Sequence, residues 1–254
     1  MNPMNKLLAV ALALALPLVA LASPLASEAT DQPAPDGNSW KFDVFLDNKE
    51  IGYHHFHLAR FGETRQLKSV ASFEYKLLFV SLYHYEHENR ETWSGDCLES
   101  IQSETDANGE PFRFEGRREA GQFRVADLQS TELLPECVMS FAYWNPSFLE
   151  QKYLLNTQSG EFQEVSISEP VFEELEIRGE LRPSYRYRLA AGALNLDLWY
   201  SPERQWLALE SEVEGGRTLR YVLQEDAELH GLATGSPRVA SIGDNGPATT
   251  EQGL

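Results

Sequence analysis

From Trp40 onward, polar and apolar side chains alternate with period two in short segments that are separated by turn residues. This alternation is typical of half-buried β-strands, because successive side chains of a strand point to opposite faces. The folded part is therefore expected to begin as an antiparallel meander. Its first strands are predicted over residues 40–46, 51–60 and 67–75, with turns at 47–49 and 61–63.

The next strand, predicted over residues 83–93, has two faces of different chemistry. One face carries Tyr83, Tyr85, His87, Asn89, Glu91 and Trp93, and the other carries His84, Glu86, Glu88, Arg90 and Thr92. The second face is polar enough that we expect it to contact water. A hairpin is predicted over 97–105 and 111–118, since Asn108-Gly109 tolerates the positive φ of a tight turn.

Residues 137–152 have apolar side chains at helical spacing. Pro146 biases Asn145 away from the α region, and Asn145 can then cap a second short helix. Short strands are predicted to follow over 153–156, 161–168, 171–178, 185–189, 194–200, 206–213 and 217–223. The patterns together predict a mainly β fold: a curved antiparallel sheet forming an open or closed β-barrel, with one short broken helix inserted mid-chain.

The N-terminus has the pattern of a secretory signal peptide. Lys6 precedes an apolar run over 7–16, and the small residues at 20–22 form a cleavage site. A membrane anchor is the alternative, but the run is interrupted by Pro17 and is shorter than the roughly 20 residues of a span. We expect cleavage after Ala22, export to the periplasm, and no transmembrane segment in the mature chain.

Residues 23–39 are rich in Pro, Ser, Ala and acid and are expected to form a flexible linker. Residues 225–254 contain few large apolar side chains and are expected to be a disordered tail, which leaves one β-rich domain over 40–224. The chain of 254 residues has 21 Lys and Arg against 39 Asp and Glu, a formal net charge of −18. Such a charge repels nucleic-acid phosphates, so no nucleic-acid partner is expected.

The chain has two cysteines, Cys97 and Cys137. An even number of cysteines in an exported protein predicts a disulfide, and closing a loop of this size stabilises the fold by about 4 kcal/mol in the chain-entropy model. The alternative is a pair of unbonded, buried thiols.

Several segments resemble an uncharacterised family of exported Gram-negative bacterial proteins known as a domain of unknown function. They are residues 73–80, Tyr85-Glu86-His87, Trp93-x-x-x-Cys97, residues 105–109, the stretch from Cys137 to Pro146, Leu155-Asn156-x-x-x-Gly160 and residues 199–211. The resemblance covers about residues 40–223. It implies no activity, substrate or catalytic residue.

Histidines on two predicted strands are possible metal ligands, because neutral imidazole binds zinc or copper. His55 and His57 share a face of one strand, whereas His84 and His87 lie on opposite faces of the other. No cysteine pair or H-E-x-x-H motif accompanies them. A packing role for these histidines is therefore preferred, and neither a metal nor a cofactor is predicted.

The sequence contains no G-x-S-x-G elbow, P-loop or dinucleotide fingerprint. Two groups of acids would offer paired carboxylates to a hydrolase: Glu86, Glu88 and Glu91, or Glu173, Glu174 and Glu176. With 39 acids in the chain such groups arise by chance, so we interpret them as solvated faces and assign no catalytic residue.

Aromatic residues exceed what one thin sheet needs for a single buried face, so the interior is either filled by them or leaves a ligand cavity lined by them. The leading hypothesis is a soluble periplasmic protein that binds a hydrophobic or lipid-like molecule without catalysis. The alternatives are a periplasmic hydrolase and a structural partner in an envelope complex. The helical break would act as a lid or plug, with cations at the rim to meet an anionic headgroup. The candidate ligand-binding residues are Lys76, Tyr85, His87, Arg113, Arg117, Tyr143, Trp144 and Asn145.

Overall fold

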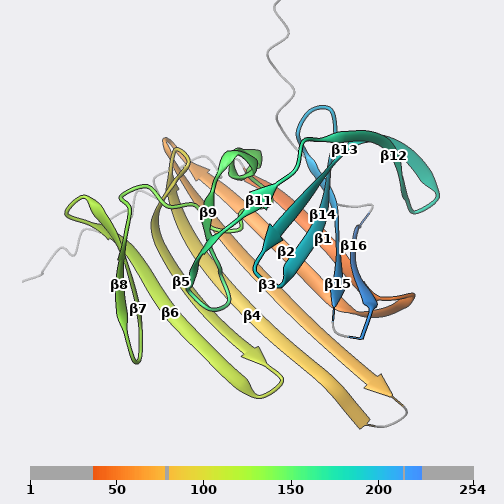
Figure 1. Ribbon diagram of the computed structural model, residues 1–254, viewed down its shortest axis with the longest axis horizontal. Coiled ribbons are helices and arrows are strands. Elements are labelled where there is room, and N and C mark those ends of the chain that lie inside the picture. The colour runs from red at the N-terminus through yellow and green to blue at the C-terminus, as the bar shows by residue number, and fades with distance from the viewer. Residues whose placement is uncertain (1–36, 78–79, 214, 225–254) are drawn as a thin grey trace, which may run out of the picture. The chain divides into compact units, whose positions relative to one another are not determined.

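The computed structural model describes residues 37–77, 80–213 and 215–224, and most of them belong to one antiparallel sheet (Figure 1). Its fourteen strands follow the order β11-β13-β14-β15-β16-β1-β2-β3-β4-β5-β6-β7-β8, and β12 pairs with β13. The strands are β1 (Gly37–Leu46), β2 (Lys49–Phe61), β3 (Thr64–Leu77), β4 (Val80–Ser94), β5 (Cys97–Ala107), β6 (Glu110–Glu119), β7 (Gln122–Asp127), β8 (Thr131–Leu134), β11 (Ser166–Ile167), β12 (Val171–Ile177), β13 (Glu180–Ala191), β14 (Leu194–Tyr200), β15 (Trp206–Val213) and β16 (Arg217–Leu223).

The predicted fold class is confirmed, in the form of an open sheet. Strands β8 and β11 end the strand order and do not pair with each other in the described residues, so hydrogen bonds do not close a barrel. Strand β1 begins at Gly37, inside the segment expected as a linker. The predicted signal peptide and C-terminal tail lie outside the described residues. Within those residues no helix is long and apolar enough to cross a bilayer.

Side-chain contacts show how strongly the sheet curves. Strands β15 and β2 are three places apart in the strand order, which in a flat sheet separates them by about 14 Å. The rings of Phe56 and Trp206 nevertheless lie with centroids 5.2 Å apart, and Phe42 is 4.3 Å from Trp206. We call the concave face that carries these rings the inner face, and the opposite face the outer face.

Strand β4 shows why the sequence builds these two faces. Its residues Asn89, Glu91 and Trp93 are buried, whereas Glu86 and Arg90 are exposed. The period-two expectation for residues 83–93, including the polar face that contacts water, is therefore confirmed.

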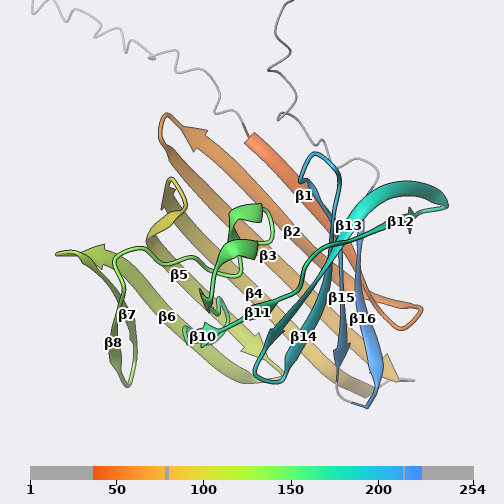
Figure 2. The ribbon, with the colours of Figure 1, turned by 45° about the horizontal axis from the view of Figure 1, so that its top comes forward.

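Residues 138–165 run across the inner face, and we call this segment the plug (Figure 2). It contains the short strands β9 (Tyr153–Leu155) and β10 (Phe162–Glu164), which pair with each other. Phe148, Leu154 and Leu155 of the plug are fully buried in the main core. Because the plug contacts Trp93 of β4 through Trp144 and Trp206 of β15 through Tyr143, it joins strands far apart in the sheet order.

The plug contains one short helix, a 3-10 turn η1 over Pro146–Glu150. Asn145 caps it as predicted, with its side-chain oxygen accepting a hydrogen bond from the backbone nitrogen of Ser147 at 3.3 Å. The helical expectation for the residues before Asn145 was wrong. Their backbone bonds elsewhere: Val138 accepts from Leu98 of β5, and Phe141 donates to Leu155 of β9. These pairings replace the hydrogen bonds of a helix.

The predicted disulfide between Cys97 and Cys137 is present, and it joins the start of β5 to the residue before the plug. The Cα atoms of the two cysteines are 4.8 Å apart. The plug is thus covalently tied to the sheet near its first residue.

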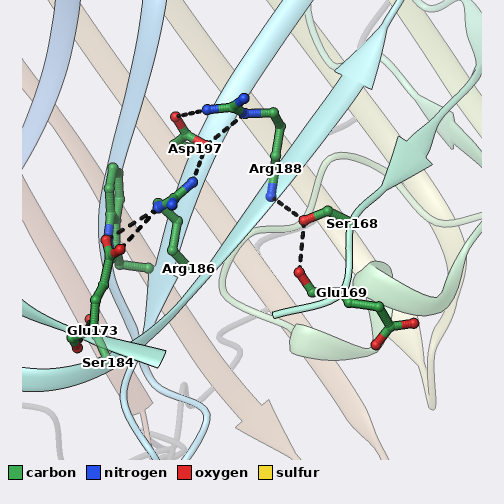
Figure 3. Close-up of polar contacts among 8 residues, drawn as sticks. Ser168, Glu169, Glu173, Ser184, Arg186, Arg188 and Asp197 are labelled. Carbon is green, nitrogen blue, oxygen red and sulfur yellow. Dashed lines mark hydrogen bonds and ion pairs between the residues drawn. The ribbon is translucent and has the colours of Figure 1, made fainter. Parts of the chain in front are cut away.

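The hairpin of β12 and β13 folds across the outer face of β14 to β16. Ile177 and Leu175 of β12 pack there with Trp199, Leu207, Ala208 and Val222, forming a second small core. An ion-pair network holds the hairpin in place (Figure 3). The guanidinium of Arg186 pairs with the carboxylates of Glu173 at 3.2 Å and of Asp197 at 3.3 Å. The guanidinium of Arg188 pairs with Asp197 at 3.1 Å. The hairpin is therefore attached to the outer face by apolar packing and by ion pairs.

Candidate functional site

A row of aromatic side chains runs along the inner face of β3 and β4, and we call it the aromatic column. It consists of Phe73, Tyr83, Tyr85 and His87. Phe73 and Tyr85 are nearly parallel at 5.2 Å, while Tyr83 and His87 stack on either side of Tyr85 at 6.4 and 6.1 Å. The column results from the alternation of β4 and from the register that places Phe73 opposite Tyr85.

The column leads from solvent into the core. Tyr83 at one end is 38% exposed, Tyr85 is partly exposed, and His87 is buried. Burial raises the pKa of the Tyr83 and Tyr85 hydroxyls and lowers the pKa of His87 to about 4, so all three side chains are neutral at pH 7. The exposed end is thus an uncharged aromatic surface.

Two side chains of the aromatic column make polar contacts with neighbouring residues. The Nδ1 atom of His87 is 2.8 Å from the hydroxyl of Thr105, and the hydroxyl of Tyr85 donates to Gln158 of the plug at 3.3 Å. Farther along β4, the carboxylate of Glu91 accepts hydrogen bonds from Asn89 and Trp93 of the same strand. Burial raises the pKa of Glu91, and these hydrogen bonds oppose that shift.

His54 of β2 lies beside the column, with its ring centroid 6.2 Å from that of His87. Its Nε2 atom is 2.7 Å from Oγ of Ser69, and its Nδ1 atom is 3.2 Å from the hydroxyl of Tyr221. The first contact has the spacing of a nucleophile and a general base. However, Ser69 is 2% exposed, so a substrate has no access to its hydroxyl in this arrangement.

Two cations meet at the exposed end of the column. The ammonium group of Lys49 lies 4.6 Å from the ring centroid of Tyr75, and the guanidinium of Arg217 lies 4.4 Å from it. Tyr75 is the cross-strand neighbour of Tyr83. Arg217 is paired with Asp47 at 2.9 Å, whereas Lys49 has no carboxylate partner among the described residues. The Lys49 ammonium donates to the backbone carbonyl of Lys76 at 2.6 Å, and its charge is not neutralised by an ion pair.

All three predicted rim cations lie on the outer face instead. Lys76 pairs with Glu74 at 2.6 Å, Arg113 with Glu104 at 3.7 Å and Arg117 with Glu119 at 3.5 Å, and all three side chains are largely exposed. The expectation that they meet a ligand at the rim of the interior is corrected by this placement. The physical reason is the two-residue period of β6, which buries Phe114 and turns both arginines outward.

The other predicted ligand-binding residues lie on the inner side. Tyr85 and His87 are neighbours in the column, and Tyr143, Trp144 and Asn145 belong to the plug. Trp144 packs edge-on against Trp93, and the Arg65 guanidinium lies 4.9 Å from its ring. Asn145 is buried and donates to Asp96 at 2.9 Å. These plug residues fasten the plug to the sheet.

The side chains of His55 and His57 do not form a cluster with each other. His55 stacks on Tyr53 of its own strand at 4.5 Å, and Nδ1 of His57 is 3.1 Å from the hydroxyl of Ser39. In the part of the chain that the structure describes, no three His, Cys, Asp or Glu side chains are placed to hold one metal ion.

The two acidic groups considered for a hydrolase are also dispersed. Glu86 is exposed and lies on the outer face with Glu88, whereas Glu91 is buried on the inner face. Glu173 is held by Arg186 and accepts a hydrogen bond from Trp199 at 2.6 Å (Figure 3), while Glu174 is exposed on the opposite face of β12. The carboxylates that share a strand face, Glu86 with Glu88 and Glu174 with Glu176, lie on exposed surface, and the third member of each group lies on the opposite face of its strand.

Sequence reasoning did not select Lys49, Tyr75, Tyr83 and Arg217 as binding residues. The alternation of β3 and β4 would have placed both tyrosines on the inner face. No local pattern predicts Lys49 and Arg217, because they reach Tyr75 from β2 and β16, which the strand order brings near β3.

Comparison with known proteins supports the fold and the family. No curated protein matches the chain. A crystal structure of a beta-barrel-like protein of the domain of unknown function DUF1849, from Brucella abortus, is similar with a TM-score of 0.53 and 9% identity; the match covers 75% of this chain and 97% of that one. This likeness concerns the fold alone. Residues 42–224 match the domain of unknown function DUF6134, and the chain belongs to that family.

Proposed function

We propose that the protein is exported to the periplasm and binds a hydrophobic or lipid-like molecule, without catalysis, at the exposed end of the aromatic column. The observation that carries this proposal is the combination, at one place, of neutral rings and a cation that has no carboxylate partner among the described residues. Tyr75, Tyr83 and Tyr85 offer an apolar surface, and Lys49 stands beside it. An amphiphile with an acidic headgroup has this pattern of chemistry.

The filled interior limits where the ligand binds. Plug residues such as Phe148 and Leu154 occupy the inner face, so an acyl chain would lie along the exposed end of the column and not deep inside the sheet. Gln158 contacts Tyr85 from the plug and would border the bound chain. Deeper entry would require the plug to move away from β4.

The sequence pattern of residues 1–22 supports export. N-terminal sequencing of the protein purified from the periplasmic fraction of its host is expected to begin at Ser23. A mature chain that retains Met1, or one that stays in the cytoplasmic fraction, would contradict this part of the proposal.

A fluorescent fatty acid, cis-parinaric acid, tests the site directly. We expect the full-length mature protein to bind it, and Tyr83→Ala to weaken binding several-fold because apolar contact is lost. Tyr53→Ala is the matched control, since Tyr53 is 39% exposed but lies on the outer face. Absence of uptake, together with an apo mass for protein taken from its host, would overturn the proposal.

The headgroup is tested with a second pair of probes. Lys49→Gln is expected to weaken binding of cis-parinaric acid and to leave binding of its methyl ester unchanged, because the ester carries no charge. Equal losses for the two probes would show that Lys49 acts on the fold of the site and not on a headgroup.

A second candidate function, a structural partner in an envelope complex, is favoured by exposed apolar side chains on the β12 and β13 hairpin. Phe172 and Leu181 are exposed, and Phe172 contacts the exposed ring of Tyr185 at 5.4 Å. Crosslinking in the host envelope tests this candidate: loss of a crosslinked band in Phe172→Ser, but not in Tyr53→Ser, would support it.

A further inference from the structure

The outer face of β2 to β7 contains a groove of about 1150 Å³, on the opposite side of the sheet from the aromatic column. Five of the 21 Lys and Arg in this acidic chain line it: Lys68, Arg90, Arg113, Arg117 and Arg124. Two outward-facing acids, Glu104 and Glu115, line it as well, together with the inner-face Glu91 and with Asp127 at the end of β7. Asp127 accepts hydrogen bonds from the backbone of Gln129 and Ser130, so it serves a turn.

The register arranges the groove as two neighbouring rows that cross six strands. The first row is His57, Lys68, Arg90, Gln102, Glu115 and Ala126, and the second is Ala59, Gln66, Thr92, Ser100, Arg117 and Arg124. All twelve residues line the groove. At the usual spacing of strands each row is about 24 Å long.

Each row contains one pair of adjacent cations, on β3 and β4 in the first row and on β6 and β7 in the second. Lys68 faces Arg90 directly in the first row, and Arg117 faces Arg124 directly in the second. Like charges directly opposite each other destabilise a sheet, and an anion bound beside them would relieve that repulsion. Glu88 lies between Lys68 and Arg90, but Arg124 has no carboxylate partner in the described part of the chain. Exposed ion pairs such as these are weak and leave the cations available.

Neutral hydrogen-bonding side chains accompany the cations: Ser100 and Gln102 of β5 lie between the two cationic pairs, and Gln66 and Thr92 lie beside Lys68 and Arg90. Gln66, Thr92, Ser100 and Gln102 make no side-chain hydrogen bond to another described residue and face the groove. From strand spacing, the backbone positions of Arg90 and Arg117 are about 12 Å apart. A ligand that satisfies the groove must therefore carry acidic groups at intervals, with hydroxyl groups between them.

We propose that this groove binds an acidic oligosaccharide. The arginines pair with its carboxylates, and the amides and hydroxyls of the groove bond its hydroxyl groups. Phe61, which is 51% exposed, offers one ring for stacking at the end of the groove. The proposal is independent of the proposed lipid site, because the two sites occupy opposite faces of the sheet.

Other anionic partners fit less well. The phosphates and acyl chains of a flat bilayer would leave the amides and hydroxyls of the groove without hydrogen-bond partners. A nucleic acid brings many phosphates, and the net charge of −18 on the whole chain repels an extended polyanion. A short acidic sugar chain bears few charges and stays within the groove.

Calorimetric titration of the full-length mature protein with hexagalacturonate tests the proposal, with maltohexaose as the neutral probe. We expect binding of hexagalacturonate, weaker binding as sodium chloride is raised, and no binding of maltohexaose. The double variant R117Q/R124Q is expected to lose about tenfold or more in affinity, the effect of removing one or two charge-assisted hydrogen bonds. The control variant R182Q/R188Q removes the same charge from β13 and is expected to bind normally.

Gln102→Ala keeps every cation and tests the groove floor. It is expected to weaken hexagalacturonate binding several-fold while the protein unfolds at the same temperature as the wild type.

The proposal is overturned if both hexasaccharides bind equally. It is also overturned if R117Q/R124Q is folded by circular dichroism and binds hexagalacturonate like the wild type. Binding of phosphatidylglycerol vesicles or of single-stranded DNA in place of hexagalacturonate would also overturn it, and would point to a membrane or a nucleic acid.

Discussion

The hydroxyl of Ser140 donates a hydrogen bond of 2.8 Å to Oε1 of Glu91, and this contact joins the plug to the inner face of β4. Both side chains are buried, with Glu91 only 3% exposed. Glu91 also accepts bonds from Asn89 on the same oxygen and from Trp93 on the other oxygen, each at 2.9 Å. A carboxylate with three donors therefore organises the centre of the core, where sheet and plug meet.

Replacing Glu91 should destabilise the protein more than replacing Ser140. Glu91→Leu leaves three buried donors without an acceptor, and each orphaned donor costs about 1 to 3 kcal/mol. Ser140→Ala removes one donor from a carboxylate that keeps two others, so we expect a loss of about 1 kcal/mol. Urea unfolding measures both, with Glu88→Leu on the outer face as the control. Equal losses for the Glu91 and Ser140 variants would contradict the central role of the carboxylate.

Removing the disulfide should loosen the plug before it loosens the sheet. Cys97→Ser with Cys137→Ser is expected to lower the free energy of unfolding by about 2 to 5 kcal/mol. The backbone bond from Leu98 to Val138, next to the disulfide, should open first. Hydrogen exchange followed by mass spectrometry is expected to show faster exchange in residues 138–155 than in β2 and β3. Uniform acceleration over the whole sheet would contradict a local effect.

The stability of the protein should fall as the pH falls below 6.5. Burial lowers the pKa of His87 to about 4, and it also lowers the pKa of the neighbouring His54. The unfolded chain then binds protons more readily than the folded one, so the stabilisation is complete above pH 6.5 and is lost toward pH 4. His87 contributes about 1.4 kcal/mol per pH unit in this range, and His54 acts in the same direction.

Comparison of two variants isolates His87 from the acids that titrate nearby, including Glu91, whose raised pKa acts with the opposite sign. His87→Asn keeps a polar atom near Thr105 but does not titrate, so its stability should vary less steeply between pH 6.5 and 4. His84→Asn on the outer face should retain the slope of the wild type. Identical slopes for wild type and His87→Asn would refute the assignment.

The alternation of side chains predicted the sheet well wherever the strands are long. Strands β7 and β8 were not predicted. Strand β8 buries only Leu134 and so shows no alternation, whereas β7 alternates the buried Phe123 and Val125 with exposed neighbours and could have been found. The stretch before Asn145 was expected to be helical because its apolar residues have helical spacing. Its backbone instead bonds to β5 and β9, and burial of both sides of the segment overrides that local preference.

The candidate site was predictable only in part. Tyr85 and His87 follow from one strand, whereas the meeting of Lys49, Tyr75 and Arg217 depends on the sheet order. The net charge of the chain also gave no indication of the cation-lined groove on the outer face. A total of −18 excludes a basic protein, but it does not describe how cations are distributed over one face of one sheet.

Gly116 of β6 should tolerate no side chain, because a Cβ atom there would lie 2.5 Å from Cε1 of Phe123 and 2.7 Å from Cγ2 of Ile101. Both neighbours are buried in the main core, so neither can move freely. Gly116→Ala is expected to lower the free energy of unfolding by about 1 to 3 kcal/mol through overpacking. Glu115→Ala, one residue away but facing solvent, is the control and should change it little. If the clash with Phe123 is the cause, Phe123→Leu should cost less in the Gly116→Ala background than in the wild type. Additive losses in urea unfolding would show that the cost arises elsewhere.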